Sequence, residues 1–277
     1  MSLIEEKLRL FYENRVVNWH EHVWFTPDRK LDVPRCEGLV EDAARTGTDM
    51  LVCSLPLLQQ QVTPEEFRLC NDTLAQALRR HPNEMRGFAF VNPGYRREAL
   101  DEIRRCVEVY GMIGVKLYYQ YFISDPAVRD LIELCISLDL PILVHATKLN
   151  YHSWEQPFAS NGEHFALAGK AYPEAKFVMA HISGGGDWEW SLKAIADCPN
   201  VLTDISGSVI DDGIVEKTVS ILGAERVLFG TDGSYAACVG KVIGCDLTEA
   251  QKKTILNNPT FERYLGRGQT EGRTGTC

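Results

Sequence analysis

The chain has 277 residues, of which 45% are hydrophobic, and its formal net charge is -9. This size and apolar content suit one barrel domain of about 250 residues, and the acidic balance disfavours nucleic acid as a partner because phosphate binding requires a basic face. The nine cysteines include no Cys-x-x-Cys pair, which predicts reduced thiols in a cytoplasmic protein rather than a disulfide scaffold. No apolar run approaches the roughly 18 residues of a membrane-spanning helix, so no membrane partner is expected.

Residues 1–15 are charged throughout and predict a short helical extension before the domain itself. From residue 16 onward, short runs rich in Val, Ile, Leu and Phe alternate with stretches of helical periodicity. The runs cover residues 16–23, 49–55, 86–91, 113–119, 141–146, 176–182, 201–205 and 226–231. Continuous apolar runs of this length are typical of parallel strands that are buried on both faces.

The segments between the runs predict helices, of which the clearest begins at Thr63. Thr63 precedes Pro64 and Glu66, which gives a capping side chain, a proline in the first turn and an early acid. Eight strand–helix units without a break in composition predict a single-domain α/β fold, a (β/α)8 TIM barrel over residues 16–266. The Gly-rich, polar residues 267–277 predict a flexible tail. A Gly-x-Gly-x-x-Gly motif is absent after the first run, which disfavours a nucleotide-binding open sheet.

Five side chains that can bind metal or transfer protons stand at the ends of these runs. They are His20, His22, His145, His181 and Asp232. A parallel barrel gathers the carboxyl ends of its strands on one face, so these side chains are expected to converge there. His20 and His22 are two residues apart, which places both on one face of a strand and Glu21 on the other. Each histidine alone is equally explained as a hydrogen-bonded core residue, but together they predict one metal-centred site.

Several stretches of the chain resemble the amidohydrolase superfamily, in the amidohydrolase-2 branch that also contains decarboxylases, lactonases and hydratases. The resemblance covers about residues 16 to 266. Its stretches are RGFAFVNP, GMIGVKLYY, LIELCISLDLPILVHA, PEAKFVMAHISGGG, NVLTDISGS, RVLFGTDGS and ILNNPTFERYLG. The first strand departs from the family pattern, because Asn18 stands where the family usually has an acidic residue.

The resemblance implies that His20, His22, His145 and Asp232 bind one divalent metal ion, with zinc as the first candidate and manganese as the second. Asp232 would also accept a proton from a metal-activated water, whose pKa such an ion lowers toward about 7. His181 would be the nearby acid or base, or a further ligand.

The resemblance also bears on Lys116, which ends the fourth run. Lys116 is expected to be an unmodified cation that contacts a substrate carboxylate. In a binuclear site it would instead be carboxylated and bridge two metals, with His145 and His181 holding the second.

Aromatic and cationic side chains follow three of the runs and predict the lining of the pocket. The expected substrate-binding residues are Trp24, Tyr118 and Lys148, together with Lys116. Such a lining suits an aromatic or unsaturated carboxylic acid.

The expected function is a metal-dependent hydrolase that uses a metal-activated water on a lactone, amide or ester. The alternative is a metal-dependent decarboxylase, a lyase that uses the same residues on an aromatic or unsaturated carboxylic acid. A metal nuclease or phosphoesterase is disfavoured because Lys116 stands where a glutamate ligand is expected, and a noncatalytic barrel is disfavoured by the full residue set. The expected partners are a small-molecule substrate and, in a homodimer of the kind common in this family, a second copy of the chain.

Overall fold

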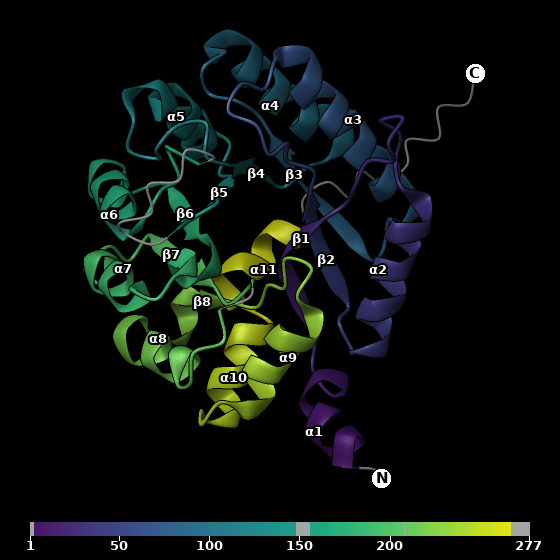
Figure 1. The fold of residues 1–277 in the computed structure, drawn as a ribbon, viewed down its shortest axis with the longest axis vertical. Helices are drawn as coiled ribbons and strands as arrows, with labels where there is room; N and C mark the ends of the chain where they lie inside the picture. The colour runs from purple at the N-terminus through teal and green to yellow at the C-terminus, as the bar shows by residue number, and fades with distance from the viewer. Residues whose placement is uncertain (1–2, 148–155, 208, 267–277) are drawn as a thin grey trace.

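The computed structural model describes residues 3–147, 156–207 and 209–266. Within these residues, eight parallel strands form one sheet whose spatial order is the order of the sequence. The strands are β1 (Val17–His22), β2 (Met50–Ser54), β3 (Met85–Phe90), β4 (Gly114–Leu117), β5 (Pro141–Val144), β6 (Lys176–Met179), β7 (Val201–Asp204) and β8 (Val227–Leu228). Each apolar run overlaps one of these strands, with β3 beginning one residue before its run, and the ring of strands confirms the predicted (β/α)8 barrel (Figure 1).

The barrel closes between its first and last strands through backbone hydrogen bonds. The amide of Trp19 donates to the carbonyl oxygen of Phe229 at 2.8 Å, and the amide of Thr231 donates to that of His20 at 3.2 Å. Strand β8 is shorter than the predicted run because the chain turns at Gly230 and Thr231 to meet β1. The closing contacts therefore come from a turn as well as from a strand.

Helices surround the ring of strands on its outside, except for α11 (Pro259–Leu265), which covers one end of the ring (Figure 1). In the described residues they are α1 (Leu3–Tyr12), α2 (Val33–Arg45), α3 (Pro64–Arg80), α4 (Arg96–Tyr110), α5 (Arg129–Ser137), α6 (Gly162–Ala171), α7 (Trp188–Ile195), α8 (Ile214–Leu222), α9 (Tyr235–Gly244), α10 (Glu249–Leu256) and α11 (Pro259–Leu265). Short 3-10 helices are η1 (Pro126–Val128), η2 (Ala180–Gly184) and η3 (Ala224–Arg226). The predicted tail at 267–277 lies outside the described residues.

The start of α3 is the one that the sequence predicts. The Thr63 hydroxyl accepts a hydrogen bond from the Glu66 amide at 3.3 Å, and the Glu66 carboxylate accepts one from the Thr63 amide at 2.9 Å. This reciprocal pair is a capping box, and Pro64 occupies the first turn without a lost hydrogen bond.

Strand β1 contains a bulge that decides which of its side chains enter the barrel. Its pairing with β2 runs from Asn18 opposite Leu51 to Glu21 opposite Cys53, so two residues of β1 stand against one of β2. The extra residue brings Trp19 and His20 to the inner side together. Trp19 belongs to the core below, and His20 begins the cluster of histidines above it.

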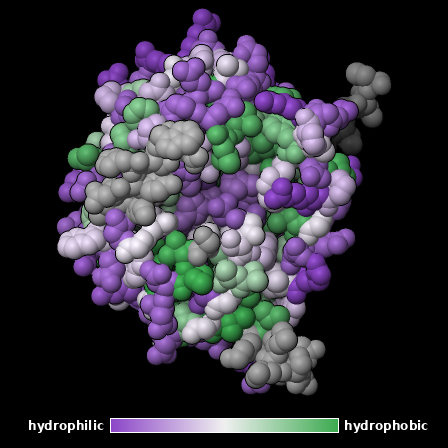
Figure 2. All heavy atoms as spheres, viewed as in Figure 1, coloured by the Kyte–Doolittle hydropathy of each residue, from purple (hydrophilic) through white to green (hydrophobic). Residues whose placement is uncertain are grey.

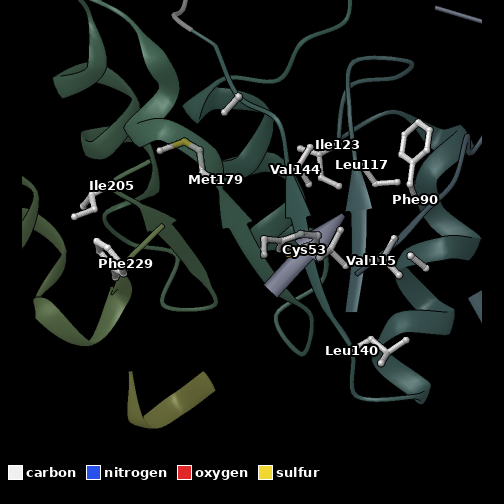
Figure 3. Packing of buried hydrophobic residues seen from close by; sticks show 14 of the residues in the cluster. Cys53, Phe90, Val115, Leu117, Ile123, Leu140, Val144, Met179, Ile205 and Phe229 are labelled. Carbon is white, nitrogen blue, oxygen red and sulfur yellow. The ribbon is translucent and has the colours of Figure 1, made fainter. Parts of the chain in front are cut away.

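Apolar side chains pack in two layers, inside the ring and between the ring and the helices. Alternation along β4 places Val115 and Leu117 in the outer layer, which Figure 3 shows, and turns Lys116 inward. The inner layer is covered at the amino end of the strands by α11, because the rings of Trp19 and Phe261 meet edge to face with centroids 5.1 Å apart. Burial of each such large apolar side chain contributes about 1.5–3 kcal/mol.

The surface of the molecule is hollowed at the centre of the face viewed in Figure 2, and hydrophilic residues line the hollow. The eight cysteines among the described residues are buried and form no disulfide, as the sequence predicts. None of the helices in the described part of the chain combines the length and the apolar character needed to cross a bilayer.

Candidate metal centre

Histidines from three strands and an aspartate after a fourth meet at the carboxyl ends of the strands. The Nε2 atoms of His22, His181 and His20 lie 2.9, 3.7 and 4.0 Å from carboxylate oxygens of Asp232. The ligand atoms of His20, His181 and Asp232 all lie within 4.8 Å of one another. His145 adjoins this group, because its Nδ1 atom lies 3.2 Å from Nε2 of His181. The structure thus brings together all five residues that the sequence singles out.

The outer ring nitrogens of three histidines are fixed by partners behind them. Nδ1 of His20 lies 2.9 Å from Oδ2 of Asp204, and Nδ1 of His181 lies 2.8 Å from the hydroxyl of Ser206. Nδ1 of His22 lies 3.0 Å from the hydroxyl and 3.3 Å from the carbonyl oxygen of Ser54. Partners of this kind orient metal-binding imidazoles and fix their tautomers.

These hydrogen bonds assign the tautomers of two of the rings, His20 and His181. Asp204 accepts from His20 and from the hydroxyl of Ser206, so the Ser206 oxygen is left to accept from Nδ1 of His181. The hydroxyl of Ser54 can either donate to Nδ1 of His22 or accept from it, so these contacts are compatible with both tautomers of His22. The assigned Nε2 lone pairs near the carboxylate of Asp232 are therefore those of His20 and His181.

Burial and hydrogen bonds keep imidazoles of this cluster neutral and its carboxylates ionised, so that both can bind a cation. Burial lowers the pKa of both His20 and His181 to about 4, so both rings are neutral at pH 7. Burial opposes ionisation of Asp204, but His20 and Ser206, which donate hydrogen bonds to it, outweigh burial and hold the pKa of its carboxyl below its usual range. Neutral imidazoles beside ionised carboxylates are the donor set that a divalent metal ion requires.

Lys116 is the cation that the structure places at this cluster. Its side chain is completely buried on β4, and Nζ lies 2.8 Å from Nε2 of His20. Burial lowers the pKa of Lys116 to about 8, although Asp232 and Asp204 act in the opposite direction.

The donor set fits a divalent ion. Nε2 of His181 and Nδ1 of His145 are both acceptors, because Ser206 and Gln156 accept from the other nitrogens of these rings, yet they lie 3.2 Å apart. A positive ion between such atoms removes the conflict, and nitrogen with carboxylate oxygen suits zinc or manganese.

The backbone is strained where it presents two of these side chains. Asp232 has a φ of 47°, and His181, Ile182 and Ser183 have φ values of 62°, 48° and 65°. Left-handed backbone is unfavourable for residues other than glycine, and it persists at functional sites where surrounding contacts hold it. The sequence signals for these turns are the glycines of AHISGGG and FGTDG.

Two further glycines allow close approach to the histidine rings. A Cβ atom at Gly230 would lie 2.9 Å from Cβ of His20, and one at Gly207 would lie 3.1 Å from Nδ1 of His181. A larger residue at either position would push a histidine out of place.

A cavity of about 500 Å³ opens beside the cluster. Its lining residues are His145, Ala146, Thr147, Gln156, His181, Gly184, Gly207, Val209, Asp232 and Ser234. The volume is suited to a small organic molecule. His181 and Asp232 belong to both the cluster and the lining, so a bound molecule would contact them directly.

The expected substrate-binding residues have different surroundings. The ring of Tyr118 stacks on His145 with centroids 4.3 Å apart, which holds it close to the cluster. Trp24 packs against Arg35, whose guanidinium lies 3.5 Å above its ring. Like Trp24, Tyr118 and Lys116 are not among the described residues that line the cavity, and they adjoin it only through the histidines. Lys148 lies outside the described residues.

Sequence reasoning gave no role to Asp204, Ser206 and Gln156. The NVLTDISGS stretch ends a strand with Asp204, which is the same signal that identified Asp232. Gln156 accepts from Nε2 of His145 at 3.2 Å and comes from a loop without a recognisable pattern.

Comparisons with known proteins bear on the family and on the fold. The Amidohydro_2 family model, described as an amidohydrolase, matches residues 17–243. The fold is similar to 2,6-dihydroxybenzoate decarboxylase from Rhizobium, with a TM-score of 0.70 and 16% identity over 91% of this chain and 98% of that one. It is also similar to 5-carboxyvanillate decarboxylase from Sphingomonas paucimobilis, with a TM-score of 0.68 and 18% identity over 90% and 98% of the two chains.

A third solved structure contains a metal ion. It is a dihydroxybenzoic acid decarboxylase from Polaromonas sp. JS666 with bound manganese and the inhibitor 2-nitroresorcinol. Its TM-score is 0.67 at 18% identity, over 91% of this chain and 97% of that one. At these identities the likeness establishes a shared barrel fold.

Proposed function

This chain belongs to the amidohydrolase family whose model matches residues 17–243, and from that premise we propose that it is a metal-dependent decarboxylase of an aromatic or unsaturated carboxylic acid. One observation carries the proposal. The acceptor-rich cluster around Asp232 is combined with the buried ammonium of Lys116, which lies 2.8 Å from Nε2 of His20. A metal ion and a buried cation together form a strong site for a carboxylate.

The comparisons favour decarboxylation over the hydrolysis that the sequence favoured. The three solved structures described above are decarboxylases, and their names give aromatic carboxylates as substrates. The same histidines and aspartate would serve a hydrolase, so the residue set is neutral between the reactions. The preference rests on the similarity of fold and on Lys116.

His20, His22 and Asp232 would hold the metal ion. A further imidazole would come from His181 or His145, whose facing nitrogens lie 3.2 Å apart. When bound, the ion supplies positive charge that attracts the oxygen atoms of the substrate and stabilises negative charge that develops on them. Manganese and zinc both suit these ligands.

The residues of the chain then bind the substrate and move one proton. Lys116 pairs with the substrate carboxylate, and the ring of Tyr118, held against His145, supports the substrate's apolar face. Decarboxylation breaks the bond between the substrate carbon and its carboxyl group, releases carbon dioxide, and leaves an electron pair that must take up one proton. That proton comes from solvent, because His181 is neutral and Asp232 is ionised at pH 7, and we assign its relay to these two residues, which line the cavity.

The test is a substrate panel with protein purified without chelators or immobilised nickel. The panel contains hydroxylated benzoic acids on one side and lactones, esters and amides on the other. We expect carbon dioxide release from members of the first group, together with about one bound metal ion per chain. Treatment with a chelator should stop the reaction, and added Mn²⁺ or Zn²⁺ should restore it.

Variants at the centre make the test specific. His20→Ala and Asp232→Ala should lose both metal and activity, whereas Glu102→Gln, which changes a buried carboxylate on α4, should keep both. Hydrolysis of a lactone or amide without carbon dioxide release would overturn the decarboxylase assignment in favour of a hydrolase. A content of two metal ions per chain would instead indicate a carboxylated Lys116.

A further inference from the structure

Glu21 is a completely buried carboxylate on the outer face of β1, behind the histidines. Its Oε1 atom accepts hydrogen bonds from the hydroxyl of Thr231 and from the amide of Gly233, the latter at 3.0 Å. Its Oε2 atom accepts from the amide of His22 at 3.1 Å. The carboxylate therefore forms hydrogen bonds with the residues before and after Asp232 and with the amide of His22.

The turn around Asp232 needs such support. Asp232 and Gly233 have φ values of 47° and 74°, so a residue that carries a side chain adopts left-handed backbone here. The amide of Asp232 donates to the carbonyl oxygen of His20 at 2.8 Å. Every one of these contacts ties the turn to β1, the strand that carries His20 and His22.

Asn18 also forms hydrogen bonds with Thr231, and they determine that the Thr231 hydroxyl donates to Glu21. Its side-chain amide donates to the Thr231 hydroxyl at 2.7 Å, and its Oδ1 atom accepts from the amides of His20 and Thr231 at 3.1 and 3.2 Å. Because the Thr231 hydroxyl accepts from Asn18, its own proton is free to go to Glu21. The chain of hydrogen bonds thus ends on the Glu21 carboxylate.

The bulge in β1 allows Asn18 and Glu21 to lie on the same, outer face of the strand. Asn18 and Glu21 are three residues apart, yet both pair with outward-facing residues of β2, Leu51 and Cys53. The same bulge directs His20 and His22 to the opposite face. The bulge therefore determines which side chains of β1 support the turn around Asp232 and which face the candidate metal centre.

We propose that Glu21 is a positioning residue that holds Asp232 at the distance from His20 and His22 that binding of a divalent metal ion requires. Glu21 touches neither the metal-facing nitrogens nor the cavity lining, and it acts through the turn Thr231–Gly233. The inference rests on the proposed metal centre and adds a residue to it.

The experiment measures binding of Mn²⁺ alone to metal-free protein, by electron paramagnetic resonance of the free ion. Glu21→Gln keeps an acceptor for Thr231 and Gly233 but places an amide against the His22 amide, and Thr231→Val removes the hydroxyl at nearly constant volume. Each variant should weaken Mn²⁺ binding by about 10- to 100-fold, the usual effect of losing a partner behind a metal ligand. The double variant should lose less than the two losses combined, because Glu21 and Thr231 belong to one hydrogen-bond network that supports the same turn.

Glu102→Gln is the matched control. Glu102 is equally buried and accepts hydrogen bonds from Asn71 and Arg105, but it lies on α4. It should lower the melting temperature and leave Mn²⁺ affinity unchanged. If Glu21→Gln and Thr231→Val behave like this control, with lower melting temperatures and wild-type affinity, the positioning role is wrong while the metal centre stands. If the wild-type protein binds no Mn²⁺, the proposed function fails and this inference fails with it.

Discussion

Nδ1 of His20 lies 2.9 Å from a carboxylate oxygen of Asp204, and both side chains are completely buried 184 positions apart in the chain. Asp204 also accepts from the backbone amide of His181 at 3.0 Å. One carboxylate at the end of β7 therefore orients the imidazole of β1 and the strained turn after β6. The candidate metal centre depends on this residue although it faces away from the cavity.

Asp204→Asn tests this dependence. The amide cannot accept from His20 and Ser206 as the carboxylate does, and the loss of charge removes the support for the Nδ1–H tautomer of His20. We expect metal affinity to fall by about 10- to 100-fold. Metal content after dialysis against a series of buffered free-metal concentrations measures the effect. Unchanged affinity in a folded variant would show that the tautomer is fixed by other contacts.

Lys116→Met separates substrate binding from metal binding. Removing the ammonium leaves the substrate carboxylate without its buried partner, a loss of about 2–5 kcal/mol in such pairs. The variant should therefore lose most of its kcat/KM for carboxylates while retaining its metal, because Nε2 of His20 is released from its 2.8 Å contact with Nζ. Parallel measurement of turnover and metal content checks both statements. Loss of the metal in this variant would instead make Lys116 part of the metal-binding set.

Two glycine substitutions form a matched pair. In Gly230→Ala the new Cβ would lie 2.9 Å from Cβ of His20, so His20 must shift and metal affinity should fall. In Gly240→Ala, within α9, the new Cβ meets no atom within 4 Å. That variant should keep its metal and gain up to about 1 kcal/mol of stability from better helix propensity. Equal metal affinity in the two variants would contradict the close packing at Gly230.

The acid stability of the protein should depend on Glu102. Burial alone would raise the pKa of this carboxyl, but hydrogen bonds from Arg105 and Asn71 outweigh burial and lower it. A folded-state pKa below the unfolded value of about 4.3 gives stability that is complete above that value and is lost as the pH falls through the folded pKa.

Urea unfolding at a series of pH values tests this sign. The free energy of unfolding of the wild-type protein should fall more steeply in acid than that of Glu102→Gln, which has no carboxyl to titrate. Parallel curves would mean that the hydrogen bonds to Glu102 do not shift its pKa.

The sequence predicts the barrel well because its strands are buried on both faces. Continuous apolar runs mark such strands without knowledge of their neighbours, and each predicted run overlaps an observed strand. Where β8 is shorter than predicted, the cause is a tertiary contact, since Phe229 and Thr231 hydrogen-bond to β1. The bulge in β1 is likewise invisible in the sequence, because it is defined by pairing with β2.

The residues of the candidate site also divide into those that the sequence predicts and those that only the structure shows. His20, His22, His145, His181 and Asp232 could be predicted to converge because the ends of parallel strands do so. Asp204 ends β7 and could have been predicted from the same signal as Asp232. Ser206 could not, because its role depends on which ring it contacts. The role of Trp24 in substrate binding stays a prediction. Its place after a strand suggested the pocket, and its ring packs against Arg35.

The seam of the barrel has a consequence for how the protein matures. His20 and His22 stand on the first strand, while Asp232 follows the last, and the two meet only when the turn after β8 hydrogen-bonds to β1. A growing chain therefore exposes its histidines long before it contains the aspartate that completes the donor set. Binding of a metal ion by the complete donor set must wait until the ring has closed. Metal binding therefore follows closure of the barrel and cannot stabilise an incomplete barrel.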